Sequence, residues 1–421
     1  MSATVAQPPK PEPPSATRLD EPAHPLARLT PQQLDQLGRE FDALHDEVYG
    51  DLGERDARYI RNTIKLHRHL VLGSRLLLLG SRKRPLRLAG VAALSLAKIL
   101  ENMEIGHNVM HGQWDWMNDP DVNSRNWDWD TASPADAWRH SHNYEHHTFT
   151  NIRGKDRDLG YEIMRIDPHQ KWHPVYLLQP LYNLLLMGFF EWGVALHDLN
   201  HEAIRSGEKS KAQALAELKA IGVKARRQIV KDYLAFPALS AALSGALAAR
   251  RGGRGRRRRR RGGRDGVAAG AAEVARETFS ATATANFSAN IVRNVWAYSI
   301  IFCGHFPDQT YTFSQAEVEN ETRGGWYVRQ LLGAANIDGH APFHFLSGNL
   351  SFQVEHHLFP DMPSSRYAEI APRVREICAR YDLPYNTGPL RKQLGTVHRT
   401  ILRLAFPGGR VRPKPGPYRA S

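Results

Sequence analysis

Three histidine clusters, far apart along a chain of 421 residues, restrict the possible folds more than any other feature. They are "GHNVMHG" at 106–112, "RHSHNYEHHTFTN" at 139–151 and "FQVEHHLFP" at 352–360. Neutral imidazole is a good ligand for iron, copper, zinc and nickel, and one metal ion takes several ligands. If the clusters form one site, the fold must bring distant segments together on one side of the molecule.

The spacing within the clusters indicates which side chains can cooperate. Three pairs stand four positions apart: His107 with His111, His142 with His146, and Gln353 with His357. Residues four apart lie on the same face of a helix. The adjacent histidines, His147 and His356, point about 100° away by the 3.6-residue period. This pattern predicts that one helix supplies ligands to two neighbouring ions.

Several segments are apolar enough to enter a bilayer, and they approach the roughly 20 residues that a spanning helix needs. They are 88–105, 175–196, 233–249 and 281–304, with a shorter run at 70–80 that completes a hairpin with the first. Ionisable residues such as Lys98, Glu191 and Arg293 interrupt them, and such groups at membrane depth usually face the interior of a helix bundle. The alternative is a soluble all-α protein in which these helices are buried.

The rest of the chain divides by composition. Residues 1–29 are a Pro-rich tail, 30–66 are predicted N-terminal cytosolic helices that begin at Thr30-Pro31, and 401–421 are a basic tail. The predicted membrane domain covers 67–400 and contains an Arg/Gly-rich inserted loop at 250–278. The formal charge is +13, and ten arginines at 250–264 supply much of it. The two cysteines, Cys303 and Cys378, exclude a disulfide scaffold and a CxxC metal site.

The segments "HNVMH", "HNYEHH" and "QVEHH" resemble the three histidine boxes of the membrane fatty-acid desaturases. The longer runs "AKILENMEIGHNVMHGQWDWMNDP", "FEWGVALH", "NVWAYSIIFCGHFPD" and "SGNLSFQVEHHLFPDMPSSR" resemble most the actinobacterial acyl-CoA desaturases of the stearoyl- or linoleoyl-CoA type. The resemblance extends from about residue 50 to about 400. The segment 250–278 looks like an insertion, and it contains no box residue.

This resemblance implies an all-α fold: an integral membrane bundle of about four spans, with a cytosolic helical cap that holds a histidine-rich di-iron site. By motif match, the expected ligands are His107, His111, His142, His146, His147, His305, His356 and His357. Gln353 stands where related enzymes have a further histidine, so Gln353 or Asn349 is a possible ligand, direct or through a water. Outer groups orient the imidazoles of a metal site, and Glu104, Glu145 and Glu355 are candidates for that role.

The resemblance also implies the O₂-dependent desaturation of a long-chain fatty acyl chain, on acyl-CoA or an acyl lipid. Removing hydrogen from an unactivated methylene needs an oxidant derived from O₂, which iron can supply and zinc cannot. The chain has no flavin or nicotinamide fingerprint and no cysteine cluster for iron–sulfur ligation. Two electrons must therefore come from a partner, a ferredoxin-type or NADPH-dependent oxidoreductase. We expect a multi-pass protein of the cell membrane with the catalytic histidines on the cytoplasmic side.

Three other functions compete with this one. A fatty-acyl or lipid hydroxylase uses similar boxes. His142-Asn-Tyr-Glu145-His146 also satisfies the H-x-x-E-H pattern of inverted zinc peptidases, with Glu145 as general base, but that function leaves four box histidines without a role. The third alternative is nucleic-acid binding, because an arginine run attracts phosphate in a salt-dependent manner. The run lacks interleaved aromatic residues, so we expect it to contact anionic lipid rather than a specific nucleic acid.

The membrane topology is constrained by the boxes, which must share one side. An even number of crossings must then lie between 147 and 356, whereas three apolar candidates lie there. Either 175–196 lies in the interface, which puts the arginine run outside against the positive-inside rule, or 281–304 does not span. The family pattern favours the first arrangement.

Overall fold

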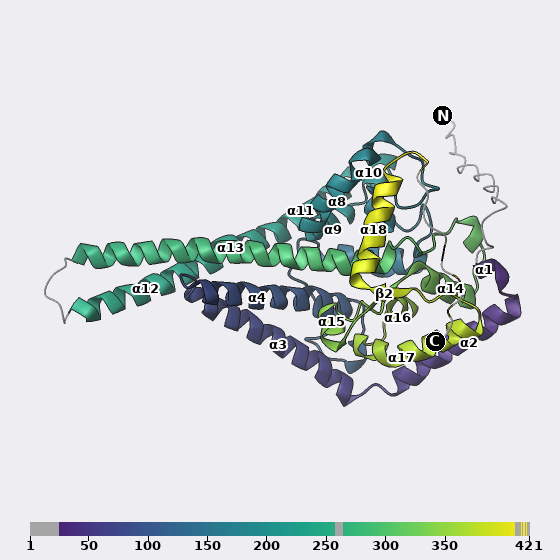
Figure 1. Cartoon of the computed structure of the whole chain (residues 1–421), viewed down its shortest axis with the longest axis horizontal. Helices are drawn as coiled ribbons and strands as arrows, with labels where there is room; N and C mark the ends of the chain where they lie inside the picture. Colours follow the sequence, from purple (N-terminus) through teal and green to yellow (C-terminus); the bar gives the residue numbers. More distant parts are fainter. Residues whose placement is uncertain (1–24, 257–263, 409–413, 415, 417, 419–421) are drawn as a thin grey trace.

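The computed structural model describes residues 25–256, 264–408, 414, 416 and 418, and the described chain is almost entirely helical (Figure 1). Its α-helices are α1 (Pro25–Arg28), α2 (Pro31–Gly50), α3 (Glu54–Leu79), α4 (Arg84–Leu100), α5 (Asn108–Met110), α6 (Ala135–Trp138), α7 (His147–Phe149), α8 (Gln179–Gly188), α9 (Phe190–His197), α10 (His201–Ser206), α11 (Lys211–Ile229), α12 (Phe236–Arg256), α13 (Arg264–His305), α14 (Arg323–Gly333), α15 (Ala341–Leu346), α16 (Gln353–Leu358), α17 (Tyr367–Arg380) and α18 (Leu390–Leu404). Most of the two predicted tails lies outside the described residues.

Shorter helical elements and two strands complete the fold. Three are π-helices: η1 (Glu101–His107), η3 (Arg139–His146) and η6 (Val230–Ala235). The 3-10 helices are η2 (Asp115–Met117), η4 (Leu159–Glu162), η5 (Pro174–Leu178), η7 (Ala316–Val318) and η8 (Ser364–Arg366). The strands β1 (Asn336–Asp338) and β2 (Thr387–Pro389), which the sequence did not predict, form a parallel pair.

Four long helices project from a compact cap (Figure 1). The predicted hairpin of the runs 70–80 and 88–105 is confirmed, because α3 and α4 pack against each other through a tight turn. The predicted boundary at residue 66 falls inside α3, which continues without a break to Leu79. The second pair is α12 and α13, which pack along each other; α13 also packs along α4, and α12 contacts α3.

The Arg/Gly-rich segment 250–278 is not the loop that its composition predicted. Helix α12 extends to Arg256 and helix α13 starts at Arg264, so only 257–263 lies outside the described residues. The alanine-rich stretch that follows the arginines has a high intrinsic helix propensity. Its packing against α12 adds tertiary contacts to that preference, and the two helices continue well past the α3–α4 turn (Figure 1).

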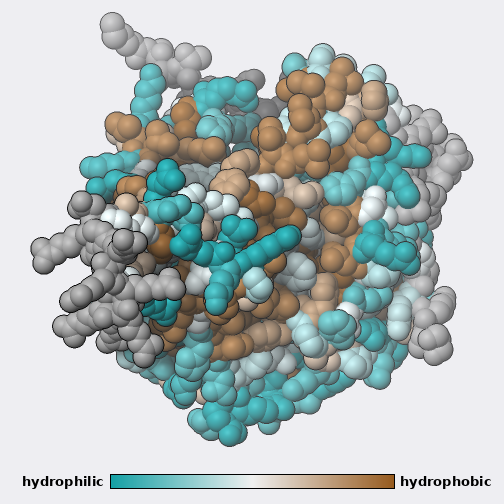
Figure 2. Space-filling view, turned by 60° about the vertical axis from the view of Figure 1, so that its left-hand side comes forward, coloured by the Kyte–Doolittle hydropathy of each residue, from teal (hydrophilic) through white to brown (hydrophobic). Residues whose placement is uncertain are grey.

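Length and apolarity alone single out one helix, Lys211–Gly252, as able to cross a membrane among the described residues. About four spans were expected. The other long helices carry exposed leucines, including Leu72 and Leu76 on α3 and Leu88 on α4. Their charged residues lower the mean hydropathy of these helices. Figure 2 views the molecule with the free ends of the long helices turned toward the reader. Hydrophobic side chains cover much of this face, with hydrophilic side chains among them and at the borders of the face.

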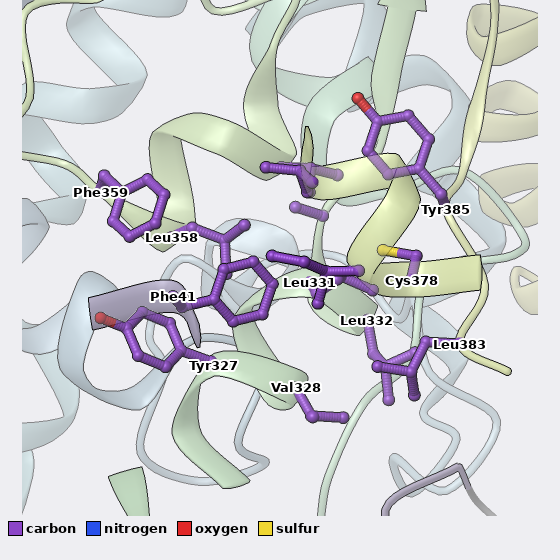
Figure 3. Packing of buried hydrophobic residues seen from close by; sticks show 14 of the residues in the cluster. Phe41, Tyr327, Val328, Leu331, Leu332, Leu358, Phe359, Cys378, Leu383 and Tyr385 are labelled. Carbon is purple, nitrogen blue, oxygen red and sulfur yellow. The ribbon is translucent and has the colours of Figure 1, made fainter. Parts of the chain in front are cut away.

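The cap has its own hydrophobic core (Figure 3). It begins at α2, whose predicted N-cap is confirmed: Thr30 accepts from the backbone N–H of Gln33, and the Gln33 side chain accepts from that of Thr30. Phe41 of α2 is fully buried and packs between Tyr327 of α14 and Phe359, at ring-centroid distances of 5.0 and 6.2 Å. This core holds α16, and with it the third histidine cluster, in the cap.

Two close approaches fix the cap further. A Cβ on Gly324 of α14 would lie 1.8 Å from the carbonyl oxygen of Leu34, so α2 and α14 are in backbone contact that only glycine permits. Next to α16, the Asn336 side chain of β1 accepts from the backbone N–H of Val354 and donates to Glu355. The short sheet therefore anchors the helix that carries His356 and His357.

Candidate metal centre

Two of the histidine clusters lie on π-helical turns rather than on the regular α-helices that their spacing suggested. His107 ends η1, and His142 and His146 lie in η3. A π turn bonds residue i to i+5 instead of i+4, so residues four and five positions away both approach residue i. The ring of His142 accordingly lies 5.1 Å from that of His146 and 5.0 Å from that of His147.

The structure brings all eight predicted histidines into one cluster, and seven of them form two groups. In each group, the candidate ligand atoms lie within 4.8 Å of one another. The first group is His107, His111, His142 and His356, and the second is His146, His305 and His357. His147 lies between them, with its ring 4.7 Å from that of His111 and 4.5 Å from that of His357. The adjacent His356 and His357 thus face different groups.

The ring nitrogens of these histidines divide into bonded and unbonded atoms. On the Nδ1 side, His146 lies 3.0 Å from Asp156, His356 3.1 Å from the Tyr367 hydroxyl and His357 3.0 Å from Oε1 of Gln330. Within the described residues, several buried ring nitrogens have no hydrogen-bond partner: Nε2 of His111, His142, His146 and His357, both nitrogens of His147, and Nδ1 of His305.

This division fits metal ligation. A histidine that binds metal through one nitrogen usually donates the other N–H to a carboxylate or a carbonyl, which fixes the ring. Unpaired buried polar atoms are otherwise costly. The set of donors suits a metal that accepts several imidazoles, and iron is such a metal.

The electrostatics keep most of these rings neutral. Burial, with the neighbouring histidines, lowers the pKa of His111, His147 and His357 well below the usual value, and the same holds for His356. His146 differs. Burial lowers its pKa, but the charges of Asp156 and Asp158 outweigh that effect and raise it. Neutral imidazole is the form that ligates metal.

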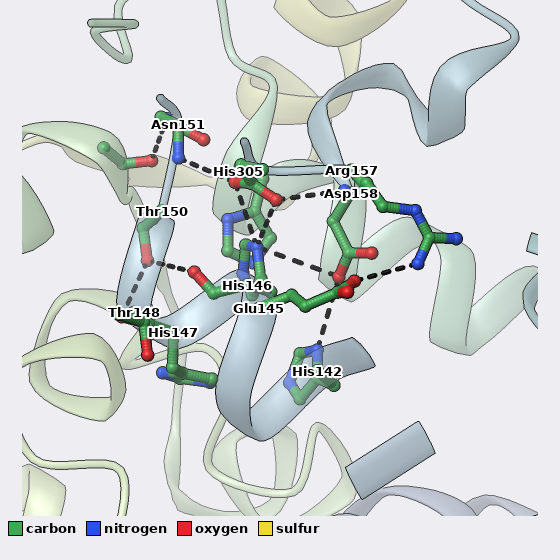
Figure 4. A network of polar contacts seen from close by, with 12 residues as sticks. His142, Glu145, His146, His147, Thr148, Thr150, Asn151, Arg157, Asp158 and His305 are labelled. Carbon is green, nitrogen blue, oxygen red and sulfur yellow. Dashed lines mark hydrogen bonds and ion pairs between the residues drawn. The ribbon is translucent and has the colours of Figure 1, made fainter. Parts of the chain in front are cut away.

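Two aspartates that contact the histidines, Asp156 and Asp158, were not revealed by the sequence. Figure 4 shows Asp158 beside His142 and His146. Asp156 contacts His146 and accepts from the backbone N–H of Asn151. Asp158 lies 3.4 Å from Nδ1 of His142 and 3.0 Å from Nε2 of His197. The only signal was a pair of acidic residues in "GKDRDLG", which lie ten or more positions after the histidines that they contact. Helical periodicity does not predict contacts over such a separation.

The three glutamates predicted to orient the imidazoles have other partners in the described structure. Glu104 accepts from Tyr59, Asn349 and Ser364. Glu355 accepts from Asn336 and Tyr385. Both are fully buried, but their hydrogen bonds hold the cap together and reach no box histidine. In the described residues, the groups that contact ring nitrogens of the box histidines are instead Asp156, Asp158, Tyr367 and Gln330.

Glu145 forms an ion pair with Arg157 at 2.8 Å and lies 3.5 Å from His140 (Figure 4). A peptidase of the H-x-x-E-H type needs this carboxylate as a general base beside the metal, so its engagement by Arg157 argues against that alternative. Of the two possible additional ligands, Asn349 donates to Tyr59 and Glu104. Gln353 instead lies beside the second group, with its amide nitrogen 3.0 Å from Nε2 of His305.

A cavity of about 60 Å³ adjoins the first group. Its lining includes His107 and His142 together with the apolar side chains of Phe190, Ala297 and Ile301. Sites for drug-sized ligands usually measure about 300–1,000 Å³. A long ligand could therefore enter only if the lining side chains rearrange.

Known proteins resemble this chain over most of its length. The family model described as "Fatty acid desaturase" matches residues 85–389. Proteins of two Mycobacterium tuberculosis strains, both described as "NADPH-dependent stearoyl-CoA 9-desaturase", are 44% identical over 382 residues, which is 91% of this chain and 82% of theirs. "Fatty acid desaturase 3" of Homo sapiens is 35% identical over 85 residues, 20% of this chain and 19% of that protein. No solved structure matches.

Proposed function

This chain belongs to the fatty acid desaturase family, and we propose that it introduces a double bond into a long-chain fatty acyl-CoA of the stearoyl type. The observation that carries the proposal is the pair of histidine groups and their ring nitrogens. The Nδ1 atoms of His146, His356 and His357 lie against protein groups. The Nε2 atoms of His111, His142, His146 and His357 have no hydrogen-bond partner within the described residues. Seven imidazoles in two groups exceed the four ligands of a single tetrahedral zinc site.

We propose that the two groups hold two irons. His107, His111, His142 and His356 would bind one, and His146, His305 and His357 the other, with His147 between them. Bound iron would supply the O₂-derived oxidant that an unactivated methylene requires. The residues of the chain do the rest: Asp156, Asp158, Tyr367 and Gln330 orient the rings, and burial keeps water from them.

The substrate proposal rests on the cavity and on the relatives. The name of the mycobacterial proteins specifies stearoyl-CoA as their substrate and NADPH as their reductant. In this chain, the lining of the cavity combines apolar side chains such as Phe190 and Ile301 with His107 and His142. An acyl chain held there would present a methylene pair to the histidine groups, which is catalysis by positioning. Two electrons would come from an NADPH-dependent oxidoreductase or a ferredoxin-type donor.

The family is membrane-associated, and we propose that α3, α4 with η1, α12 and α13 are the four spans. Their exposed leucines suit contact with lipid. Two charged residues of these helices pair with acidic residues of neighbouring elements. Buried Lys98 of α4 donates to Asp232 of η6 at 2.8 Å, and Arg293 of α13 pairs with Glu191 of α9. This is how ionisable groups at membrane depth usually occur.

The segment 175–196 supports the same topology. It is divided among η5, α8 and α9, and none of these is long enough to cross a bilayer. Exposed side chains such as Leu181 and Leu184 would let it lie in the interface. The cap and its histidines would then face the cytoplasm on one side of a multi-pass bundle.

Metal and product analysis together test the proposal. We expect purified protein to contain two irons and little zinc, and to convert labelled stearoyl-CoA to an unsaturated product when given O₂ and a reductant. His146→Ala should lose iron and turnover. His140→Ala is the matched control, because His140 lies in the same π-helix with its side chain 68% exposed. One zinc per chain, or equal damage by both substitutions, would refute the assignment.

A further inference from the structure

A second cavity lies far from the histidines, at the turn between α3 and α4. It is a groove of about 1020 Å³ between this turn and α13. Arg82, Arg87 and Arg276 line it, together with hydroxyl groups that include Ser81 and Ser280. Leu88, Val91, Ala281 and Ala285 form an apolar wall.

The groove has an unbalanced positive charge. Glu277 is its acidic lining residue, and it pairs with Arg82 at 2.6 Å. Arg87 and Arg276 form no ion pair with any described residue. Two exposed guanidinium groups therefore face the groove without a protein counter-charge. Guanidinium is the cation that binds the oxygens of phosphate best, because its donors match their geometry.

The groove also contains an unsatisfied hydroxyl. Ser81 is 2% exposed, and its Oγ has no hydrogen-bond partner within the described part of the chain. A buried hydroxyl without a partner costs free energy, and such groups in native structures usually have a reason. A ligand oxygen in the groove would satisfy it once the side chains that cover the Oγ move aside.

The helices fix how far the groove lies from the histidine groups. One helical path runs from Arg84 at the start of α4 to His107, and a second runs along α13 from Ser280 to His305. At about 1.5 Å per residue, each path is roughly 35 Å long. The hydrocarbon core of a bilayer is about 30 Å thick. The groove therefore lies at the level of the opposite membrane interface, given the span assignment proposed above.

We propose that this groove binds the phosphate-bearing headgroup of an anionic phospholipid in the leaflet opposite the histidine groups. Arg87 and Arg276 would contact the phosphate and Ser81 would donate to it, while Leu88 and Val91 would contact the glycerol and the first methylenes. The proposal rests on the membrane placement of the proposed function. The positive-inside rule disfavours lysine and arginine on the non-cytoplasmic side of the membrane. A bound anionic lipid would neutralise the basic residues of the α3–α4 turn on that side.

Lipid retention by the purified full-length protein in detergent tests the proposal without using activity. Phosphatidylglycerol is titrated, and bound lipid is counted by native mass spectrometry, with phosphatidylcholine and inorganic phosphate as separate probes. We expect one saturable phosphatidylglycerol per chain. The double variant Arg87→Gln/Arg276→Gln should weaken binding at least tenfold, as expected for charge-assisted hydrogen bonds.

The matched control is Lys83→Gln/Arg84→Gln, which also removes two positive charges, next to the groove, at exposed residues that do not line it. We expect it to leave the affinity within twofold. An equal loss in the control would overturn the proposal in favour of general surface charge, and equal binding of phosphatidylcholine or phosphate would overturn the choice of ligand. If the double variant does not fold, Ser81→Ala decides: unchanged affinity overturns the proposal. Iron content and product formation, measured in parallel, report on the proposed function separately.

Discussion

Asp156 offers a sharp test of how the cap prepares its histidines. Its side chain is completely buried and accepts three hydrogen bonds: from Nδ1 of His146 at 3.0 Å, from the backbone N–H of Asn151 at 2.6 Å and from that of Asp158 at 3.0 Å. Asp156→Asn keeps the shape but replaces one acceptor oxygen with an NH₂ donor. At least one of the three donors then faces another donor.

The expected cost follows from these contacts. A hydrogen bond to a charged group contributes about 1.5–3 kcal/mol, so the free energy of unfolding should fall by about that amount. The ring of His146 would also lose the partner that fixes its orientation and increases its basicity. Loss of such a partner typically weakens metal binding about 10- to 100-fold, which corresponds to about 1.4–2.8 kcal/mol.

Chelator competition measures this effect directly. Iron retained by the purified protein is determined against increasing chelator, and we expect the Asp156→Asn curve to shift to about 10- to 100-fold lower chelator concentration. Asp136→Asn is the control, because the Asp136 side chain is 94% exposed and pairs with Arg139 in the same region of the chain. Coincident curves for wild type and Asp156→Asn would refute the idea that this carboxylate positions a metal ligand.

Three further predictions address other parts of the molecule. His305→Ala should remove iron and turnover together, because His305 is a proposed ligand in the second group. A residue that only caps a helix would contribute about 1 kcal/mol of stability, and its loss would leave the iron content unchanged. Gly324→Ala should destabilise the cap by about 1–3 kcal/mol in chemical unfolding, because its Cβ would meet the Leu34 carbonyl oxygen at 1.8 Å. The hydrogen bond to Asp361 raises the pKa of His45, so His45→Gln should cost up to about 1 kcal/mol below about pH 6 and progressively less as the pH rises through that raised pKa.

Each of these has a contradicting outcome. A His305→Ala protein with two irons and normal product formation would return His305 to a structural role. Gly395→Ala is the control for Gly324, since a Cβ there meets nothing within 4 Å. Equal destabilisation by the two would show that backbone contact with α2 is not the cause. A His45→Gln effect that grows with pH would have the wrong sign for a histidine stabilised in its protonated form.

Local signals in the sequence predicted several structural features correctly. The pair Thr30-Pro31 predicted the start of α2, and the apolar runs 70–80 and 88–105 predicted the α3–α4 hairpin. The histidine spacing predicted a cluster, and the structure brings those rings together. In each case the signal lies within a few residues of the feature, where periodicity and capping operate.

What the sequence did not indicate depends on tertiary contacts. The π-helical form of η1 and η3 has no composition signal, and it changes which neighbours of His142 can approach it. Asp156 and Asp158 reach their histidines through a loop whose path depends on contacts with distant residues, such as the hydrogen bonds from Asn151 to Tyr311 and Gly333. The helices that flank residues 257–263 likewise depend on the packing of α12 against α13, which composition alone does not reveal.

The division of the histidine groups among distant segments also sets the order of events during synthesis. The first group needs His356 and the second needs His357, although five of the histidines have already emerged by residue 147. At about 5–20 residues per second, the ribosome takes about 10–40 seconds to proceed from His147 to His356. During that interval neither proposed ligand set is complete, because His356 and His357 have not been synthesised. We therefore expect the proposed irons to bind only after most of the chain has been translated.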